Sequence, residues 1–310
     1  MAVGRVIRLA LVAALILGAG SAPRTLQYWE YGGVHLQLNR VRLLTERLSK
    51  QNLLYQFRLA GEQRGSLVAT AAQIDAAMVA LIDGSPRLGV PQPATLEIRR
   101  QIDEMDSAWG ALRSIAVASP FEYVRRAAER GSSDPLGIRH FEQLATAIYR
   151  SADAVSAAYI ANCEQQSIQG CRTVATATAS GMLSERLMKE FAFVIAGVDS
   201  SSNTARLSKS RESLERTLAA ASQEESVQAT MSPDRGKSGV VAAGIGDEIQ
   251  SSWQGLRGDV DRVIGGEKDP ALLNGALARQ HALLRDLQRL SVAVRRFAAA
   301  RRAAAARPPS

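Results

Sequence analysis

Apolar residues recur along most of the chain at alternating steps of three and four, the spacing that places side chains on one face of an α-helix. In the clearest stretch the inward positions are Val34, Leu38, Val41, Thr45, Leu48, Asn52, Tyr55 and Leu59. This spacing is typical of the buried seam of a helix bundle. Only 5% of the residues are aromatic and β-branched runs are few. The pattern therefore predicts an all-α protein.

Internal similarity divides the chain into two copies of one unit. Residues 42–50 align with residues 181–189, with identical Leu, Glu, Arg, Leu and Lys at matching places. Further along, the segment around Trp109 matches the segment around Trp253. An Asp-Pro pair then precedes the last predicted helix of each copy. Three landmarks in the same order predict a tandem repeat.

Glycine and proline clusters divide each copy into four helices. In the first copy, residues 25–163, the predicted helices cover residues 25–62, 66–83, 94–130 and 136–163. In the second copy, residues 172–304, they cover residues 172–198, 203–222, 240–264 and 270–304, with a mobile loop at 222–239. Short turns between consecutive helices predict antiparallel bundles. We expect two tandem antiparallel four-helix bundles that follow in series as an elongated, rod-like helical protein, with a flexible tail at 305–310.

The first 22 residues have the pattern of an export signal. Arg5 and Arg8 precede an apolar run from Leu9 to Leu17, and small residues follow it. The run is short for a transmembrane helix, which needs about 20 residues, so an uncleaved anchor is the alternative interpretation. Because we find no second hydrophobic stretch after residue 22, we expect a periplasmic protein.

Two cysteines, Cys163 and Cys171, lie at the junction of the two copies. On one continuous helix their Cα atoms would be about 12 Å apart, beyond the reach of a disulfide. Gly170 could break the helix and let the two residues meet. An oxidising compartment favours a structural disulfide, and two free thiols are the alternative. No histidine lies nearby, so we expect no metal site.

Charge and residue chemistry argue against several classes of function. The net charge is +8, but the basic residues are spread without interleaved aromatic residues, so we expect no nucleic-acid partner. No nucleophile motif, phosphate-binding loop or carboxylate pair is present, so we expect neither an enzyme nor a cofactor. His35, His140 and His281 are isolated and are predicted to be surface or structural residues. Trp109 and Trp253 are predicted core residues.

The run from Asn39 to Lys50 resembles the signature of the PilJ/NarX-type sensor domain, approximately A-G-x-x-R-M-L-S-Q-R-x-x-K. Residues 177–189 resemble it more closely in their Met-Leu-Ser segment. This family forms the N-terminal, extracytoplasmic domain of type IV pilus chemotaxis transducers and of nitrate/nitrite sensor kinases. The resemblance implies two tandem sensor modules.

The resemblance also implies a ligand site. In nitrate-sensing members, the arginine at the position of Arg42 contacts the anion across a dimer of first helices. Asn39 stands at the family's small glycine position, and Arg47 is a candidate second contact. In the second copy Gly181 replaces the arginine, so at most one copy is expected to keep the contact. The structural alternatives are a solvated Arg42, and an Arg47 that pairs with an acidic residue of a neighbouring helix.

Two acid–base pairs recur at helical spacing. Glu46 with Lys50, and Glu185 with Lys189, lie four residues apart with the acid first, which is the favourable order for a pair on a helix surface. The sequence therefore predicts a surface salt bridge within each of these helices.

The leading hypothesis is an exported, sensor-like binding protein for a small solute, such as the oxyanions nitrate and nitrite. It would act through a membrane receptor or an envelope protein. The alternative is a structural or adaptor protein of the envelope with vestigial ligand binding. The resemblance implies a homodimer through the first helices, but the two modules of one chain could instead pair with each other.

Overall fold

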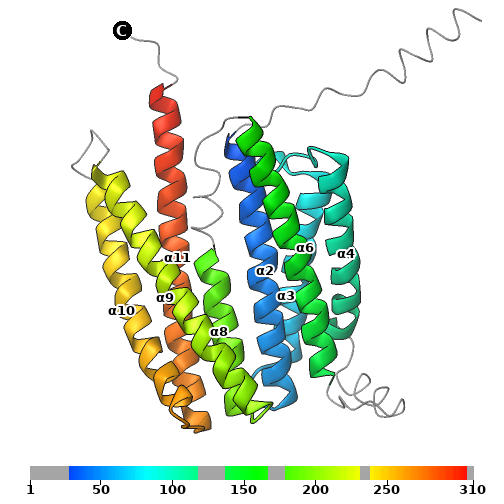
Figure 1. Ribbon diagram of the computed structural model, residues 1–310, viewed down its shortest axis with the longest axis vertical. Coiled ribbons are helices and arrows are strands. Elements are labelled where there is room, and N and C mark those ends of the chain that lie inside the picture. Colours follow the sequence, from blue (N-terminus) through cyan, green and yellow to red (C-terminus); the bar gives the residue numbers. More distant parts are fainter. Residues whose placement is uncertain (1–27, 118–136, 167–178, 231–237, 306–310) are drawn as a thin grey trace, which may run out of the picture.

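The computed structural model describes residues 28–117, 137–166, 179–230 and 238–305. These residues form eight α-helices, and their one β-type contact is a single bridge between Ser85 and Val90. The prediction of an elongated, all-α protein is confirmed (Figure 1). The predicted export signal at 1–22 and residues 306–310 lie outside the described residues.

The first bundle contains α2, α3, α4 and α6, which span Tyr28–Gln56, Arg64–Asp83, Leu96–Val117 and Ile138–Gln165. Each helix packs against its two neighbours, and α6 closes the ring against α2. Their apolar faces form one core, in which Leu38, Leu48, Ile74, Ile102 and Ile148 are fully buried. A 3₁₀ turn, η1 (Pro86–Leu88), lies between α3 and α4.

The second bundle repeats this arrangement with α8, α9, α10 and α11, which span Ala179–Ile195, Ser200–Thr230, Ser238–Ile264 and Pro270–Ala305. Here α11 closes the ring against α8. Its core includes Phe191, Leu207, Leu214, Leu256 and Leu283. The fourth helix of each copy therefore lies beside the first helix of the same copy.

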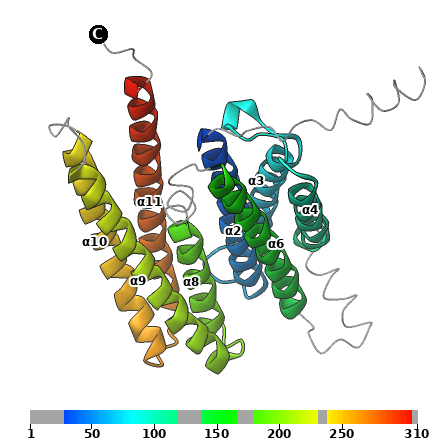
Figure 2. The same ribbon diagram turned by 45° about the horizontal axis from the view of Figure 1, so that its top comes forward.

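The two bundles lie side by side, so the predicted end-to-end rod is not observed. In both views α8 lies alongside α2, and the two helices run in the same direction (Figures 1 and 2). As a result α2 is surrounded by α3, α6 and α8. The long dimension of the molecule follows the helices rather than the order of the bundles.

Several helix boundaries in the structure differ from those predicted from the sequence. Helix α2 ends at Gln56 rather than at residue 62, because Arg58 and Ala60 adopt left-handed φ angles of 54° and 55°. The predicted loop at 222–239 is too long: α9 continues to residue 230 and α10 begins at residue 238. Residues 222–230 contain neither glycine nor proline and are rich in helix-favouring Ala, Gln and Glu, so nothing in them stops the helix.

Gly33 allows the turn around η1 to pack directly on α2. A Cβ atom at this position would lie 2.2 Å from the carbonyl oxygen of Gly89. No side chain fits at that distance, so the contact between α2 and the α3–α4 connection requires glycine.

Within the described part of the chain, one helix, α3, is long and apolar enough to cross a membrane by length and composition. The expectation that no hydrophobic stretch follows residue 22 was therefore wrong for residues 64–83. In this structure α3 contributes Leu67, Ile74 and Leu81 to the core of the first bundle.

Candidate functional site

The centre of the molecule is the contact between α2 and α8, where two glutamates are fully buried. Glu46 and Glu185 occupy equivalent positions in the two copies, and neither has exposed surface. A buried carboxylate is costly unless cations and hydrogen bonds compensate it. In each case the compensating cations come from the other bundle.

Glu46 of α2 is held by two cations of α8. Arg186 donates from Nε to Glu46 Oε1 at 2.6 Å, and Lys189 Nζ lies 2.8 Å from Oε2. Both bonds cross from one bundle to the other.

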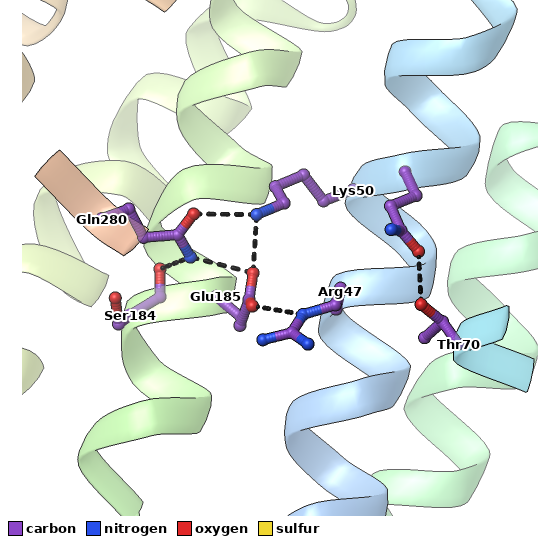
Figure 3. A network of polar contacts seen from close by, with 7 residues as sticks. Arg47, Lys50, Thr70, Ser184, Glu185 and Gln280 are labelled. Atoms are coloured by element: carbon purple, nitrogen blue, oxygen red, sulfur yellow. Dashed lines mark hydrogen bonds and ion pairs between the residues drawn. The ribbon is translucent and has the colours of Figure 1, made fainter. Parts of the chain in front are cut away.

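Glu185 of α8 is held by the equivalent cations of α2 (Figure 3). Arg47 donates from Nε to Glu185 Oε1, and Lys50 donates from Nζ to Oε2, both at 2.7 Å. The two sets of bonds are reciprocal, as they would be around an approximate two-fold axis between two parallel helices. The interpretation of Arg47 as the partner of an acidic residue on a neighbouring helix agrees with this geometry.

The predicted salt bridges within one helix were wrong. Glu46 pairs with Lys189 rather than Lys50, and Glu185 pairs with Lys50 rather than Lys189. The physical reason is that α8 covers the polar face of α2. Residues that would point to solvent in an isolated bundle therefore meet the equivalent residues of the other copy, and each carboxylate faces cations of the other helix.

The network keeps its carboxylates ionised. Burial alone would raise the pKa of Glu185, but the charges of Lys50 and Arg47 lower it to about 2. For Glu46, the lowering effects of Lys189 and Arg186 also exceed the raising effect of burial on its pKa. The two carboxylates therefore stay charged across the physiological pH range.

The fourth helices add a further partner to each lysine. Lys189 also contacts Glu142 of α6, at 2.6 Å. Lys50 instead donates to the amide oxygen of Gln280 of α11, at 2.8 Å, and Gln280 donates to Glu185 at 2.8 Å. Sequence reasoning missed Glu142 and Gln280, because their distance in the chain from the first helices leaves no local pattern.

Arg42, the predicted anion ligand, is nearly buried and already paired. Only 8% of the residue is exposed. One Nη group lies 2.5 Å from Asp153 of α6, and the other donates to Asn39 at 2.8 Å. Its Nε is buried and has no hydrogen-bond partner among the described residues. A carboxylate of the chain itself therefore occupies the position where an anion was expected.

The structure brings two of the three predicted ligand residues together. Arg42 donates a hydrogen bond to Asn39. Arg47 instead lies on the side of the α2–α8 contact that faces α11, which we call the α11 side; the opposite side faces α6. Gly181, the counterpart of Arg42, lies against α2: a Cβ atom there would be 2.9 Å from Leu43 Cδ1. The glycine thus serves close packing, and the second copy offers no guanidinium here.

The remaining candidates are structural. His35 is fully buried and shares a hydrogen bond with Ser156, and burial together with Arg42 lowers its pKa to about 4. Cys163 is buried at the end of α6 and is disulfide-bonded. Cys171 lies outside the described residues, so its pairing stays a prediction.

Contacts away from the centre also follow the repeat. Arg113 of α4 pairs with Asp75 of α3 at 3.0 Å, and Arg257 of α10 pairs with Glu215 of α9 at 3.2 Å. The tryptophan that precedes each arginine by four residues is buried. The second and third helices therefore meet through the same pair of positions in both bundles.

One comparison with known proteins gives a match. The family model described as the type IV pili methyl-accepting chemotaxis transducer N-terminal domain, PilJ, matches residues 165–279. Neither the curated proteins nor the solved structures give a match. The matched residues include α8, α9, α10 and the start of α11. The match thus covers most of the second bundle, which is similar to the type IV pili methyl-accepting chemotaxis transducer N-terminal domain.

Proposed function

We propose that this protein is an extracytoplasmic, sensor-type module in which two four-helix bundles of one chain pair as two subunits of a sensor would. Its role is to bind a solute and pass the response to a membrane partner, without catalysis. The observation that carries the proposal is the reciprocal network at Glu46 and Glu185. The PilJ match to the second bundle supports the sensory role.

The network favours one register of α2 against α8. Sliding α8 along α2 would separate both glutamates from their partners, and each separated charge would remain buried. Breaking a buried ion pair typically costs about 3–5 kcal/mol. Such a contact resists small displacements and favours discrete arrangements, which is the property that a signalling interface needs.

Within this proposal Arg42 is the anion-responsive residue. Its guanidinium presents a planar fork of donors, which matches the geometry of an oxyanion. The competing carboxylate, Asp153, has 73% of its side chain exposed, so it can move into solvent at little cost. An oxyanion such as nitrate would then replace Asp153 on Arg42.

Calorimetric titration of the mature chain with nitrate and nitrite, at constant ionic strength, tests this assignment. We expect Arg42→Ala to remove the site at Arg42 and so lower the number of anions bound. Asp153→Asn should strengthen binding at Arg42, because the asparagine removes a competing negative charge. Arg113→Ala, which breaks a pair on α3 and α4, is the control for losing an arginine. Absence of binding in the wild type, or equal binding in Arg42→Ala, would contradict the anion assignment.

A second candidate function is an envelope adaptor with vestigial ligand binding. Two observations favour it: Asp153 fills the fork of Arg42, and Gly181 replaces the arginine of the second copy. This candidate predicts that the mature chain captures a specific membrane partner from envelope extracts while it binds neither anion. Anion binding that requires Arg42 would exclude it.

A further inference from the structure

The two sides of the α2–α8 contact are not equivalent in charge. On the α6 side, Glu46 and Glu142 balance the charges of Arg186 and Lys189. On the α11 side, the second partner of the lysine is the neutral amide of Gln280 rather than a carboxylate (Figure 3). The α11 side therefore has one carboxylate for two cations.

The arginines on the two sides are also covered differently. The guanidinium of Arg186 lies over the ring of Tyr149, 5.3 Å from its centroid. Arg47 has no such ring contact within the described part of the chain, although it is equally exposed, at 31% against 32% of the side chain. Arg47 uses Nε for Glu185, and Figure 3 shows its two Nη groups turned away from that carboxylate.

The unbalanced cations on the α11 side include a buried one. Lys50 is buried and shares Glu185 with Arg47. The positive potential extends to His281 of α11, whose pKa is lowered by burial and then by Lys50. Glu62 acts in the opposite direction on His281, but no ion pair joins it to Arg47 or Lys50 among the described residues.

We propose that the α11 side of the contact is a second anion site, which takes a small planar oxyanion, a carboxylate or nitrate, on the free Nη groups of Arg47. Two parallel N–H donors match the two oxygens of such an anion. The bound anion supplies the negative charge that Glu142 supplies on the other side. This inference goes beyond the proposed function, because it does not involve Arg42.

The test is a titration of the mature chain with sodium acetate and with sodium nitrate at constant ionic strength. NMR chemical shifts measure the binding. Fluoride, which has no planar pair of oxygens, is the control anion. Gln280→Glu supplies the missing charge within the protein and should weaken binding at least about tenfold, since a like charge then opposes the anion. Arg47→Gln removes the donors, and Arg113→Gln is the matched control. Thermal unfolding of each variant checks that it is folded.

Weaker binding of acetate and nitrate in both Gln280→Glu and Arg47→Gln, with unchanged binding in Arg113→Gln, would support the site. Failure of the wild type to bind either anion would overturn it, as would wild-type affinity in Gln280→Glu. If Arg42→Ala abolishes binding and Gln280→Glu does not, the anion lies on the α6 side. That result would overturn this inference and support the proposed function.

Discussion

Glu190 of α8 is an ionisable residue where the other copy has a neutral one. It is buried, is hydrogen-bonded to Ser210, and its Oε2 has no partner among the described residues. The equivalent residue of α2 is Gln51, which accepts a hydrogen bond from Thr70 at 2.8 Å. Burial raises the pKa of Glu190 to about 7, although Ser210 and Lys189 lower it. The second bundle therefore contains a group that titrates near neutral pH.

Replacing Glu190 by glutamine, the residue of the other copy, should change how stability depends on pH. Because the pKa is raised in the folded state, the stabilising contribution of Glu190 is present below about pH 4.5 and is lost as the pH rises through about 7. We expect Glu190→Gln to gain stability over the wild type across this interval, on the order of 3 kcal/mol. Urea unfolding at pH 4.5 and pH 8.5 measures the difference. A constant difference between the two proteins would contradict the assignment.

Gly33 and Gly110 offer a matched pair of helical glycines. Gly33→Ala places its Cβ against the carbonyl oxygen of Gly89, so we expect a loss of about 1–3 kcal/mol or more. Around Gly110 of α4 a Cβ would meet nothing within 4 Å. Because alanine favours helix more than glycine does, Gly110→Ala should gain about 0.5–1 kcal/mol. Equal effects in chemical denaturation would show that the turn around η1 does not pack on α2 as described.

At the scale of helices, the two glutamates of the network should differ in importance. After Glu46→Gln, Lys189 still contacts the carboxylate of Glu142, at 2.6 Å. After Glu185→Gln, Lys50 keeps only the amide of Gln280 and remains a buried, unpaired cation. We therefore expect Glu185→Gln to reduce the free energy of unfolding by at least about 1 kcal/mol more than Glu46→Gln does. Urea denaturation of the two variants measures this difference in the free energy of unfolding. A larger loss of stability in Glu46→Gln than in Glu185→Gln would contradict the expected order.

The helices themselves could be predicted well from the sequence. The seam residues Val34, Leu38, Val41 and Leu48 are all buried, and the repeat predicted four helices in each copy. The loop at 222–239 was misjudged because its glycines and proline lie only in its second half, and helix-favouring residues precede them.

The site was less predictable for a physical reason. Glu46 and Lys50 lie four residues apart, and this spacing is the same whether the face meets solvent or another helix. Only the position of α8 distinguishes the two cases. The hydrogen bond from Arg42 to Asn39 is one that a spacing of three residues on a helix allows. Asp153 comes from another helix, so no local sequence pattern predicts its contact with Arg42.

At the scale of the molecule, we propose that the two bundles take the place of the pair of subunits that the family resemblance implies. Helix α2 is covered by α3 and α6 of its own bundle and by α8 of the other bundle. A homodimer through the first helices would have to displace α8 and leave Glu46 and Glu185 buried without their cations. The contact within one chain is therefore the arrangement that we expect in solution.

A double-mutant cycle on Glu185 tests this pairing most directly. Unfolding free energies are measured for Glu185→Gln combined with Lys50→Met of the other bundle, and for Glu185→Gln combined with Lys189→Met of the same helix. We expect a coupling free energy of at least about 1 kcal/mol between Glu185 and Lys50, and of less than about 0.5 kcal/mol between Glu185 and Lys189. Coupling to Lys189 and none to Lys50 would show that the glutamate pairs within its own helix, and would contradict the pairing of the two bundles.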